Sequence, residues 1–233
     1  RSAVAAAAYR SGQKLTNEWD GVTHDYTKKG GVVHSEILLP AHAPSEFSDR
    51  STLWNSVEKS EKSRNAQLAR EIEIALPVEI DRQSQIRLVP KYVQDVFVLA
   101  GMCADFSIHD KRDGNPHAHI MLTLRPLNKH GEWGAKCRKE YDLDGHGQHI
   151  PLPNGGFKSH RVNTTDWNYP GKAEKWRAQW ARYTNAMLEF RNLSQCVDHR
   201  SYLRQGVQKI PTVHMGVAAT QMERRGLATE KGT

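Results

Sequence analysis

The sequence predicts an α+β fold in which helices flank an antiparallel β-sheet. Segments with the twofold alternation of strands are interleaved with segments whose apolar residues have helical spacing. Two predicted strands, 102–109 and 117–124, are separated only by a short turn segment, and such a connection joins antiparallel neighbours. Hydrophobic residues make up 38% of the 233 residues, which provides a sizeable core and excludes a wholly disordered chain.

The N-terminal half begins with an alanine-rich helix at 2–10, for which Ser2 is the N-cap and Gly12 the stop. The strand predicted at 70–76 has the clearest alternation of apolar and polar residues in the chain. The elements that follow the first helix are a polar loop at 20–31, a strand at 32–39, a helix at 45–62, the strand at 70–76 and a helix at 82–99.

The C-terminal half contains a long polar, glycine-rich stretch from 126 to 170. A stretch of this length without a core is usually functional or mobile in a compact domain. We find no internal repeat in the sequence. The other elements of this half are the strands at 102–109 and 117–124 around the turn segment 110–116, a helix at 172–191, and shorter helices at 201–205 and 214–225.

The chain is basic, with 33 lysines and arginines against 26 acidic residues and a formal net charge of +7. A basic domain of this size suggests a polyanionic partner. No uncharged apolar run approaches the ~20 residues of a transmembrane helix, so we expect no membrane insertion. Cys103, Cys137 and Cys196 form no CxxC pair, so we expect neither a disulfide framework nor a cysteine zinc site, and a cytoplasmic location. Because the chain starts at Arg1, we expect it to be part of a longer protein.

The segment that joins the two central strands carries three histidines. His117 and His119 point to the same face of their strand, because side chains repeat with a period of two. His109 ends the preceding strand, and the Asp-Gly and Asn-Pro pairs of the turn bring it back beside them. Three imidazoles on one face suit a divalent metal ion, with a coordination position left open for water or substrate. The alternative is a chance grouping of solvated or hydrogen-bonded histidines.

Glu71 and Glu73 share one face of the strand at 70–76, and Ile72 and Ile74 share the other. A solvent-exposed face is what such alternation usually means. A functional interpretation is also open, because a carboxylate accepts the far N–H of a ligating histidine and fixes its tautomer, or receives a proton. The sequence does not say whether this strand neighbours the histidine strand, so both interpretations stay open.

His117-Ala118-His119 fits a histidine-hydrophobic-histidine motif, and five segments in chain order carry a wider pattern. These are SAVAAAAYRSG at 2–12, SEILLP at 35–40, AREIEIALP at 69–77, the histidine segment at 109–119, and IPTVHMG at 210–216 followed by MERRG at 222–226. Together they resemble the MobA/MobL (MobQ-type) plasmid mobilisation relaxases of the HUH endonuclease superfamily. The resemblance spans nearly the whole chain, and the series is specific although each segment alone is weak.

The resemblance implies a metal-dependent, site- and strand-specific nickase of single-stranded DNA at a plasmid transfer origin. Tyr9 aligns with the family's nucleophile, which forms a 5′-phosphotyrosine, leaves a free 3′-hydroxyl and allows the strand to be rejoined. The family's strand carboxylate falls on Glu71, with Glu73 as the second candidate for a catalytic role. The expected metal is Mg²⁺ or Mn²⁺, and Zn²⁺ also suits three imidazoles. The family's metal ligands align with His109, His117 and His119.

The resemblance also implies a palm-like HUH fold. Residues 1–165 are then the relaxase catalytic core, and residues 166–233 a C-terminal helical part of the same domain. The family usually has a short strand before the alanine-rich helix, so we expect the first strand upstream of residue 1. The expected partner is single-stranded DNA of the transfer origin with an adjacent hairpin. Accessory mobilisation proteins and a coupling protein are further expected partners.

Composition alone favours a different role for Tyr9. The chain has seven tyrosines, and one at the end of an alanine-rich helix is usually a packing residue. Tyr26 is the rival nucleophile, because it lies in a polar, glycine-flanked loop. Only the family alignment selects Tyr9.

Several basic residues are candidates for contacts to a phosphate backbone, although each one alone is more simply explained as solvated surface charge. Trp133 and Trp167 lie outside the aromatic stripe of the helix at 172–191, so they are our candidates for stacking on bases. The basic candidates are Arg10, Arg70, Arg125, Lys136 and Arg138.

Two other functions fit much of the same pattern. A replication initiator or transposase of the HUH superfamily would share the metal and the tyrosine, but its tyrosine usually follows the histidine strand. A non-catalytic DNA-binding module with structural histidines would bind DNA in a salt-dependent manner without cleaving it.

Overall fold

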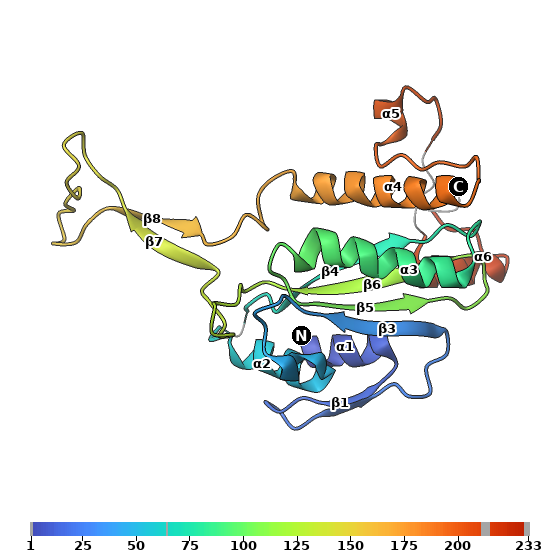
Figure 1. Ribbon diagram of the computed structural model, residues 1–233, viewed down its shortest axis with the longest axis horizontal. Helices are drawn as coiled ribbons and strands as arrows, with labels where there is room; N and C mark the ends of the chain where they lie inside the picture. Colours follow the sequence, from blue (N-terminus) through green and yellow to red (C-terminus); the bar gives the residue numbers. More distant parts are fainter. Residues whose placement is uncertain (1, 64, 211–214, 231–233) are drawn as a thin grey trace. The chain divides into compact units, whose positions relative to one another are not determined.

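The computed structural model describes residues 2–63, 65–210 and 215–230, and it confirms the predicted α+β class. The chain divides into two compact units, Arg1–Val197 and Asp198–Thr233. The first unit contains a four-stranded antiparallel sheet with helices on both of its faces (Figure 1). Within the described residues, no helix is long and apolar enough to cross a membrane.

The four strands of the main sheet occupy the predicted segments and follow the order β3-β5-β6-β4. β5 (Ala104–His109) and β6 (His117–Thr123) lie in the middle and are joined by the predicted turn. β3 (Val32–Leu38) pairs with β5, and β4 (Ala69–Ala75) pairs with β6. The strand with the two glutamates is therefore a direct neighbour of the strand with His117 and His119.

Different helices cover the two faces of this sheet (Figure 1). Ile108 and Ile120 point to the face that packs against α3 and α4, where Trp176 joins the larger core. Met121 points to the opposite face and packs in a second core with residues of α1 and α2. His119 shares that face with Met121, because the two lie two residues apart on one strand. The covering helices are α1 (Ala3–Ser11), α2 (Arg50–Lys59), α3 (Arg82–Val93) and α4 (Lys172–Phe190).

The capping signals of the first helix act as predicted. The Ser2 hydroxyl accepts a hydrogen bond from the backbone N–H of Ala5 at 3.1 Å. At the other end, Gly12 adopts a left-handed conformation with a φ of 66°, and its N–H donates to the carbonyl of Ala8. Ser2 therefore determines where α1 starts and Gly12 where it stops, and Tyr9 and Arg10 lie in its last turn.

Two predicted helices are divided in the structure. Asp49 separates the 3₁₀ turn η1 (Ser45–Ser48) from α2, because its carboxylate accepts the N–H of Thr52 at 2.8 Å and starts a new helix. The helix predicted at 82–99 continues from α3 into the π-helical segment η2 (Gln94–Val98). Apolar spacing is similar on both sides of these breaks, so it did not reveal them.

Two short hairpins lie partly or wholly where the sequence predicted loops. β1 (Lys14–Thr16) pairs with β2 (Thr23–Asp25), which lies inside the loop expected at 20–31. β7 (Cys137–Tyr141) pairs with β8 (Ser159–Asn163) inside the polar stretch at 126–170. Strands this short and polar give too few positions for an alternation signal.

Three turns within residues 126–170 have the same backbone closure. In each turn, the N–H of a glycine with positive φ donates to the carbonyl of the turn's second residue at 3.0 to 3.1 Å. The sequences of the three turns share little beyond this glycine, in agreement with the absence of a sequence repeat. The bridges that close the turns are Leu127–Trp133, Leu143–His149 and Pro151–Phe157, with Gly131, Gly147 and Gly155 as the glycines.

The second unit contains two short helices, α5 (Tyr202–Gln205) and α6 (Gly216–Arg224). Both were predicted from the sequence. The expected start of the second helix at His214 lies outside the described residues, as do residues 211–213 of the family-like segment.

Candidate active site

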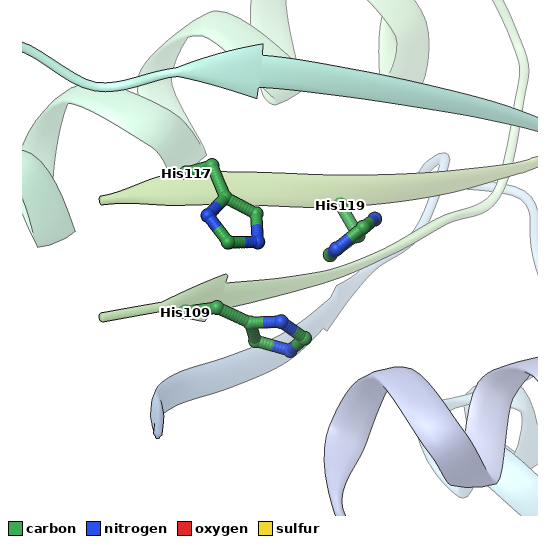
Figure 2. A group of neighbouring side chains, drawn as sticks. All are labelled: His109, His117 and His119. Carbon is green, nitrogen blue, oxygen red and sulfur yellow. The ribbon is translucent and has the colours of Figure 1, made fainter. Parts of the chain in front are cut away.

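The three predicted metal ligands come together on the sheet face that α1 covers. His109 ends β5, and the register places it directly opposite His117 of β6. The ring centroids of the three histidines lie 4.8 to 5.4 Å apart. One nitrogen of each ring lies within 4.8 Å of its counterparts, and Figure 2 shows these nitrogens turned toward one another. His109 is buried, whereas His117 and His119 are half-buried, so the group is not sealed from solvent.

Backbone carbonyls determine where two of the rings carry their protons. Nδ1 of His117 lies 2.8 Å from the carbonyl oxygen of Asn115, and Nε2 of His109 lies 2.6 Å from that of Arg10. A carbonyl oxygen only accepts, so each of these nitrogens carries the proton and donates it. In the neutral form of each ring, the other nitrogen therefore keeps its lone pair.

Glu71 has the same effect on the third ring. Its Oε1 accepts the Nδ1 proton of His119 at 2.8 Å, because β4 lies beside β6. The hydrogen bond from His119 is the main cause that lowers the pKa of Glu71, to about 2, and the guanidinium of Arg10 adds to it. Glu71 is then an ionised acceptor, and the Nε2 lone pair of His119 is left for a cation. This contact favours the supporting-carboxylate interpretation of the polar face of β4.

The donor set fits a divalent cation. Each ring donates one N–H to an oxygen and keeps one lone pair, which is the usual arrangement of histidines that ligate metals. Burial lowers the pKa of His109 to about 4, so this ring is neutral at physiological pH, as a ligand must be. The cluster could therefore hold a metal ion, and the choice among Mg²⁺, Mn²⁺ and Zn²⁺ stays a prediction.

Glu73 lies on the same face but makes a looser contact. It is directly opposite His119 in the register, and its Oε2 lies 3.9 Å from His119 Nδ1, beyond hydrogen-bond distance. Its side chain is 60% exposed. Glu73 is thus the more accessible of the two carboxylates, and Glu71 the more firmly held.

Tyr9 lies in the last turn of α1, next to Arg10, whose carbonyl accepts a hydrogen bond from His109 of the cluster. The Tyr9 ring is 44% exposed and packs edge-on against its rival Tyr26, with ring centroids 5.2 Å apart. The ammonium of Lys29 lies 3.8 Å from the centroid of the Tyr9 ring and donates to the Tyr9 carbonyl at 2.7 Å. Lys29 comes from the loop at 20–31, which meets α1 only in the folded chain, so its contact with Tyr9 could not be predicted from the sequence.

Comparison with known proteins agrees with the resemblance seen in the sequence. The model of the MobA/MobL family matches residues 1–225 of the chain. The chain belongs to the MobA/MobL family. Its three-histidine cluster is consistent with the metal site of an HUH nuclease.

Relatives support this membership over nearly the whole chain. The conjugal transfer protein TraA of Rhizobium radiobacter is 38% identical over 97% of the chain, and the probable mobilization protein MobA of Bifidobacterium longum is 35% identical over 98%. The chain spans only 21% and 43% of the lengths of these two proteins. A solved structure described as "Molecular Basis of Vancomycin Resistance Transfer in Staphylococcus aureus" matches with a TM-score of 0.73 at 34% identity, over 87% of this chain and 92% of that chain.

The predicted DNA-binding residues of this MobA/MobL chain all have partners within the protein. Arg125 and Lys136 share the carboxylate of Glu61, with nitrogen–oxygen distances of 2.9 and 2.6 Å. Arg138 pairs with Glu140 on the exposed strand β7. These ion pairs reduce the charge that each residue offers to a phosphate. A DNA-binding role for these residues stays a prediction.

Arg70 lies on the face of β4 opposite to Glu71, away from the histidines. Its guanidinium donates to the carbonyl of Trp167 at 3.1 Å and lies 5.2 Å from the ring centroid of Trp176 in α4. The sheet therefore separates Arg70 from the candidate metal site. In contrast, Arg10 lies directly in the site, where it pairs with Glu71.

The proposal that Trp133 and Trp167 stack on DNA bases is not supported by their environment. Trp167 is 4% exposed and belongs to the larger core, so it is not available to a base. Trp133 is half-buried, stacks on Phe47 with centroids 5.3 Å apart and donates from Nε1 to the Ser56 hydroxyl at 2.8 Å. Both rings are packing residues, although neither follows a helical periodicity.

A buried ion pair between Arg50 and Asp105, on the same sheet face as His119, was not predicted from the sequence. Asp105 of β5 accepts two hydrogen bonds from Arg50 of α2 and one from Trp54, each 2.8 Å long. Arg50 also donates to Gln13 and to Ser35, each at 2.7 Å. The network ties α2, β3, β5 and the segment after α1 together. Nothing in the local sequence around Asp105 predicts a partner so distant in the chain.

Proposed function

We propose that this chain is the relaxase domain of a mobilisation protein and nicks single-stranded DNA at a plasmid transfer origin. The observation that carries the proposal is the convergence of three imidazoles, each with one free lone pair, beside a helix end that exposes Tyr9. Membership of the MobA/MobL family and relatives named for conjugal transfer and mobilization support it. Because the chain spans only part of those relatives, the proposal concerns DNA processing by this domain alone.

The histidine cluster would hold the cation that makes the phosphodiester reactive. The anionic oxygens of the phosphodiester repel a nucleophile, and a bound divalent cation neutralises part of this charge and polarises the phosphorus. We expect Mg²⁺ or Mn²⁺ in this role, and Zn²⁺ is compatible with the ligands. The bonds to Asn115, Glu71 and Arg10 keep the three rings in a ligating orientation.

Tyr9 is the proposed nucleophile. Its phenol oxygen attacks the phosphorus, the bond from phosphorus to the 3′-oxygen breaks, and a 5′-phosphotyrosine and a free 3′-hydroxyl result. The phenol gives up its proton and the leaving 3′-oxygen takes one, so no proton is gained or lost overall. Because the phosphorus remains esterified, attack by a 3′-hydroxyl on the phosphotyrosine rejoins the strand.

Glu71 and Glu73 have different roles in this proposal. Glu71 is a poor base, because its pKa of about 2 reflects a carboxylate already held by His119 and Arg10. We therefore assign it the orientation of His119. Glu73 is the better candidate to take the phenol proton, since it is exposed on the same face.

The expected substrate is the single strand of the transfer origin next to a hairpin. A formal net charge of +7 favours a polyanion, and single-stranded DNA exposes the phosphodiester to attack. Accessory mobilisation proteins and a coupling protein are the further partners that we propose, with the cytoplasm as the place of action.

An adduct assay tests the function directly. A labelled single-stranded oligonucleotide that carries the transfer origin is incubated with the protein and Mn²⁺ or Mg²⁺ and run on a denaturing gel. We expect a covalent protein–DNA band that disappears with EDTA and with Tyr9→Phe.

The controls of this assay separate the alternatives. A band that survives Tyr9→Phe but not Tyr26→Phe would move the nucleophile to the neighbouring ring, which lies in contact with Tyr9. Salt-dependent binding without a covalent band under any metal condition would identify a non-catalytic DNA-binding module and refute the proposal.

A further inference from the structure

We infer that Arg10 is a positioning residue that couples the Tyr9 helix to the metal centre, rather than a contact to DNA phosphate. The inference rests on the proposed function, because it concerns the relation between the nucleophile and the metal ligands. It is carried by two separate bonds of Arg10, one from its backbone and one from its side chain.

The backbone bond joins the end of α1 to β5. Arg10 lies in the last turn of α1, where carbonyl groups have no partner within the helix. Its carbonyl accepts the Nε2 proton of His109 at 2.6 Å. His109 thereby caps the helix end and, in the same bond, turns its other nitrogen toward His117 and His119.

The side-chain bond joins α1 to β4 and, through it, to β6. Nε and Nη2 of Arg10 donate to the two oxygens of Glu71 at 2.5 and 2.7 Å, a two-pronged pairing that restricts both planar groups. Oε1 of Glu71 also accepts the Nδ1 proton of His119 at 2.8 Å. Arg10 therefore acts on His109 through one atom and on His119 through Glu71.

These contacts leave little of Arg10 for DNA. The side chain is 23% exposed, and the carboxylate of Glu71 balances its charge. Lys29 is better placed to attract a phosphate near Tyr9, because its ammonium donates to the Tyr9 carbonyl and not to a carboxylate. Because Arg10 directly follows Tyr9, its bonds connect the helix turn that carries the proposed nucleophile to two of the proposed metal ligands.

Lysine and glutamine separate a positioning role from a charge role. A lysine at position 10 keeps the positive charge but offers a single point of contact, so it does not reproduce the two parallel bonds to Glu71. A residue that serves only as a charge for DNA would tolerate lysine and not glutamine. Arg87, an exposed arginine of α3 on the other side of the sheet, is the matched control.

The experiment compares Arg10→Lys, Arg10→Gln and Arg87→Gln in three measurements. Single-turnover cleavage is followed at saturating DNA and Mn²⁺, Mn²⁺ affinity is measured by calorimetry, and DNA affinity is measured without metal at several salt concentrations. We expect both Arg10 variants to lose about 100-fold in cleavage rate and about 10-fold in Mn²⁺ affinity. The DNA affinity of both Arg10 variants and its salt dependence should stay within twofold of the unchanged protein. For Arg87→Gln, the cleavage rate, the Mn²⁺ affinity and the DNA affinity should all stay within twofold.

The coupling itself is tested with a double variant. If Arg10 acts through Glu71, then Arg10→Gln combined with Glu71→Gln should bind Mn²⁺ no more weakly than Glu71→Gln alone. Wild-type cleavage and Mn²⁺ affinity in Arg10→Lys, with a salt slope reduced by about one in Arg10→Gln, would overturn the inference in favour of a phosphate contact.

Failure of the proposed function and misfolding of a variant can both be distinguished from failure of the inference about Arg10. If the unchanged protein does not cleave, the proposed function fails, whereas the Mn²⁺ and DNA measurements still test the role of Arg10. Thermal unfolding shows whether a variant is folded. If Arg10→Gln does not fold, the Arg10→Lys results decide, because a folded lysine variant with normal Mn²⁺ affinity contradicts a positioning role.

Discussion

The nitrogen that each histidine leaves free is determined by its hydrogen-bond partner. Two partners are backbone carbonyls, and the third is the carboxylate of Glu71. Carbonyls cannot be removed by substitution, so Glu71 is the one of the three that mutation can test directly. At the scale of the residue, the metal site therefore depends on a carboxylate outside the histidine motif.

Glu71→Ala should weaken Mn²⁺ binding about 10- to 100-fold, because His119 then loses the acceptor that orients its ring. Calorimetry of the full chain measures the affinity. Glu46→Ala, at an exposed glutamate of η1, serves as the control. A Glu71→Ala protein with unchanged Mn²⁺ affinity would show that His119 needs no support from β4.

Lys29 should be more reactive than an ordinary lysine. Burial is the main cause that lowers its pKa to about 8, and the charges of Arg10 and Lys111 add to this. The folded chain thus releases this proton at a lower pH than the unfolded chain, so the contribution of Lys29 makes stability rise with pH between about 8 and 10.5.

Acylation of Lys29, followed by mass spectrometry across pH, checks this prediction. We expect the rate to rise around pH 8 and then level off, since the neutral amine is the reactive form. The exposed neighbour Lys28 provides the reference in the same digest. A rate at Lys29 that continues to rise up to pH 10.5 would mean that the amine is not desolvated in solution.

At the scale of the element, α2 is held against β5 by a buried ion pair. Arg50 and Asp105 are both nearly excluded from solvent, with side-chain exposures of 7% and 3%. Burying such charges is costly unless every donor and acceptor is paired, and here Gln13, Ser35 and Trp54 complete the network.

Asp105→Asn should lower the free energy of unfolding by about 3–5 kcal/mol, because Arg50 is left as an uncompensated buried charge. Denaturant unfolding measures this loss. Glu140→Gln, which breaks the exposed pair with Arg138, should cost less than about 1 kcal/mol. Adding Arg50→Met to Asp105→Asn should restore much of the lost free energy of unfolding. A double variant whose loss equals the sum of the losses of the two single variants would contradict this view.

At the scale of the whole molecule, all the proposed site residues lie in the unit Arg1–Val197. This unit includes α4, whose Trp176 and Leu188 are buried in two of the hydrophobic cores. The division that we proposed after residue 165 would separate these residues from the sheet that they cover. We therefore interpret 166–197 as part of the structure that supports the catalytic core.

Truncation after Val197 should leave Mn²⁺ affinity within about twofold, because every ligand and its supporting residue is retained. Truncation after residue 165 should abolish cooperative unfolding, since the sheet face with Ile108 and Ile120 loses its cover. Calorimetry and thermal unfolding of the two fragments check both outcomes. A stable 1–165 fragment would show that α4 is dispensable for the fold.

The sequence by itself was sufficient for those features that arise from neighbouring residues. Alternation along 117–123 places His117 and His119 on one face, and the short turn before them returns His109 to their side. The same local signals predicted the four strands of the sheet and the caps of α1. The order of motifs along the chain was enough to identify the family, which the comparisons confirm.

Only the tertiary structure decided which distant residues meet. The pairing of β4 with β6 brings Glu71 to His119, and the packing of α1 brings Arg10 to both Glu71 and His109. The tertiary structure also buries Trp167, which we had expected to stack on DNA bases because it lies outside the aromatic stripe of the helix at 172–191. Strand alternation and helix caps depend on energies within a few residues, whereas strand order and helix docking depend on how the whole chain buries its apolar surface. For this reason the histidine triad could be predicted from the sequence, and the contacts that orient it could not.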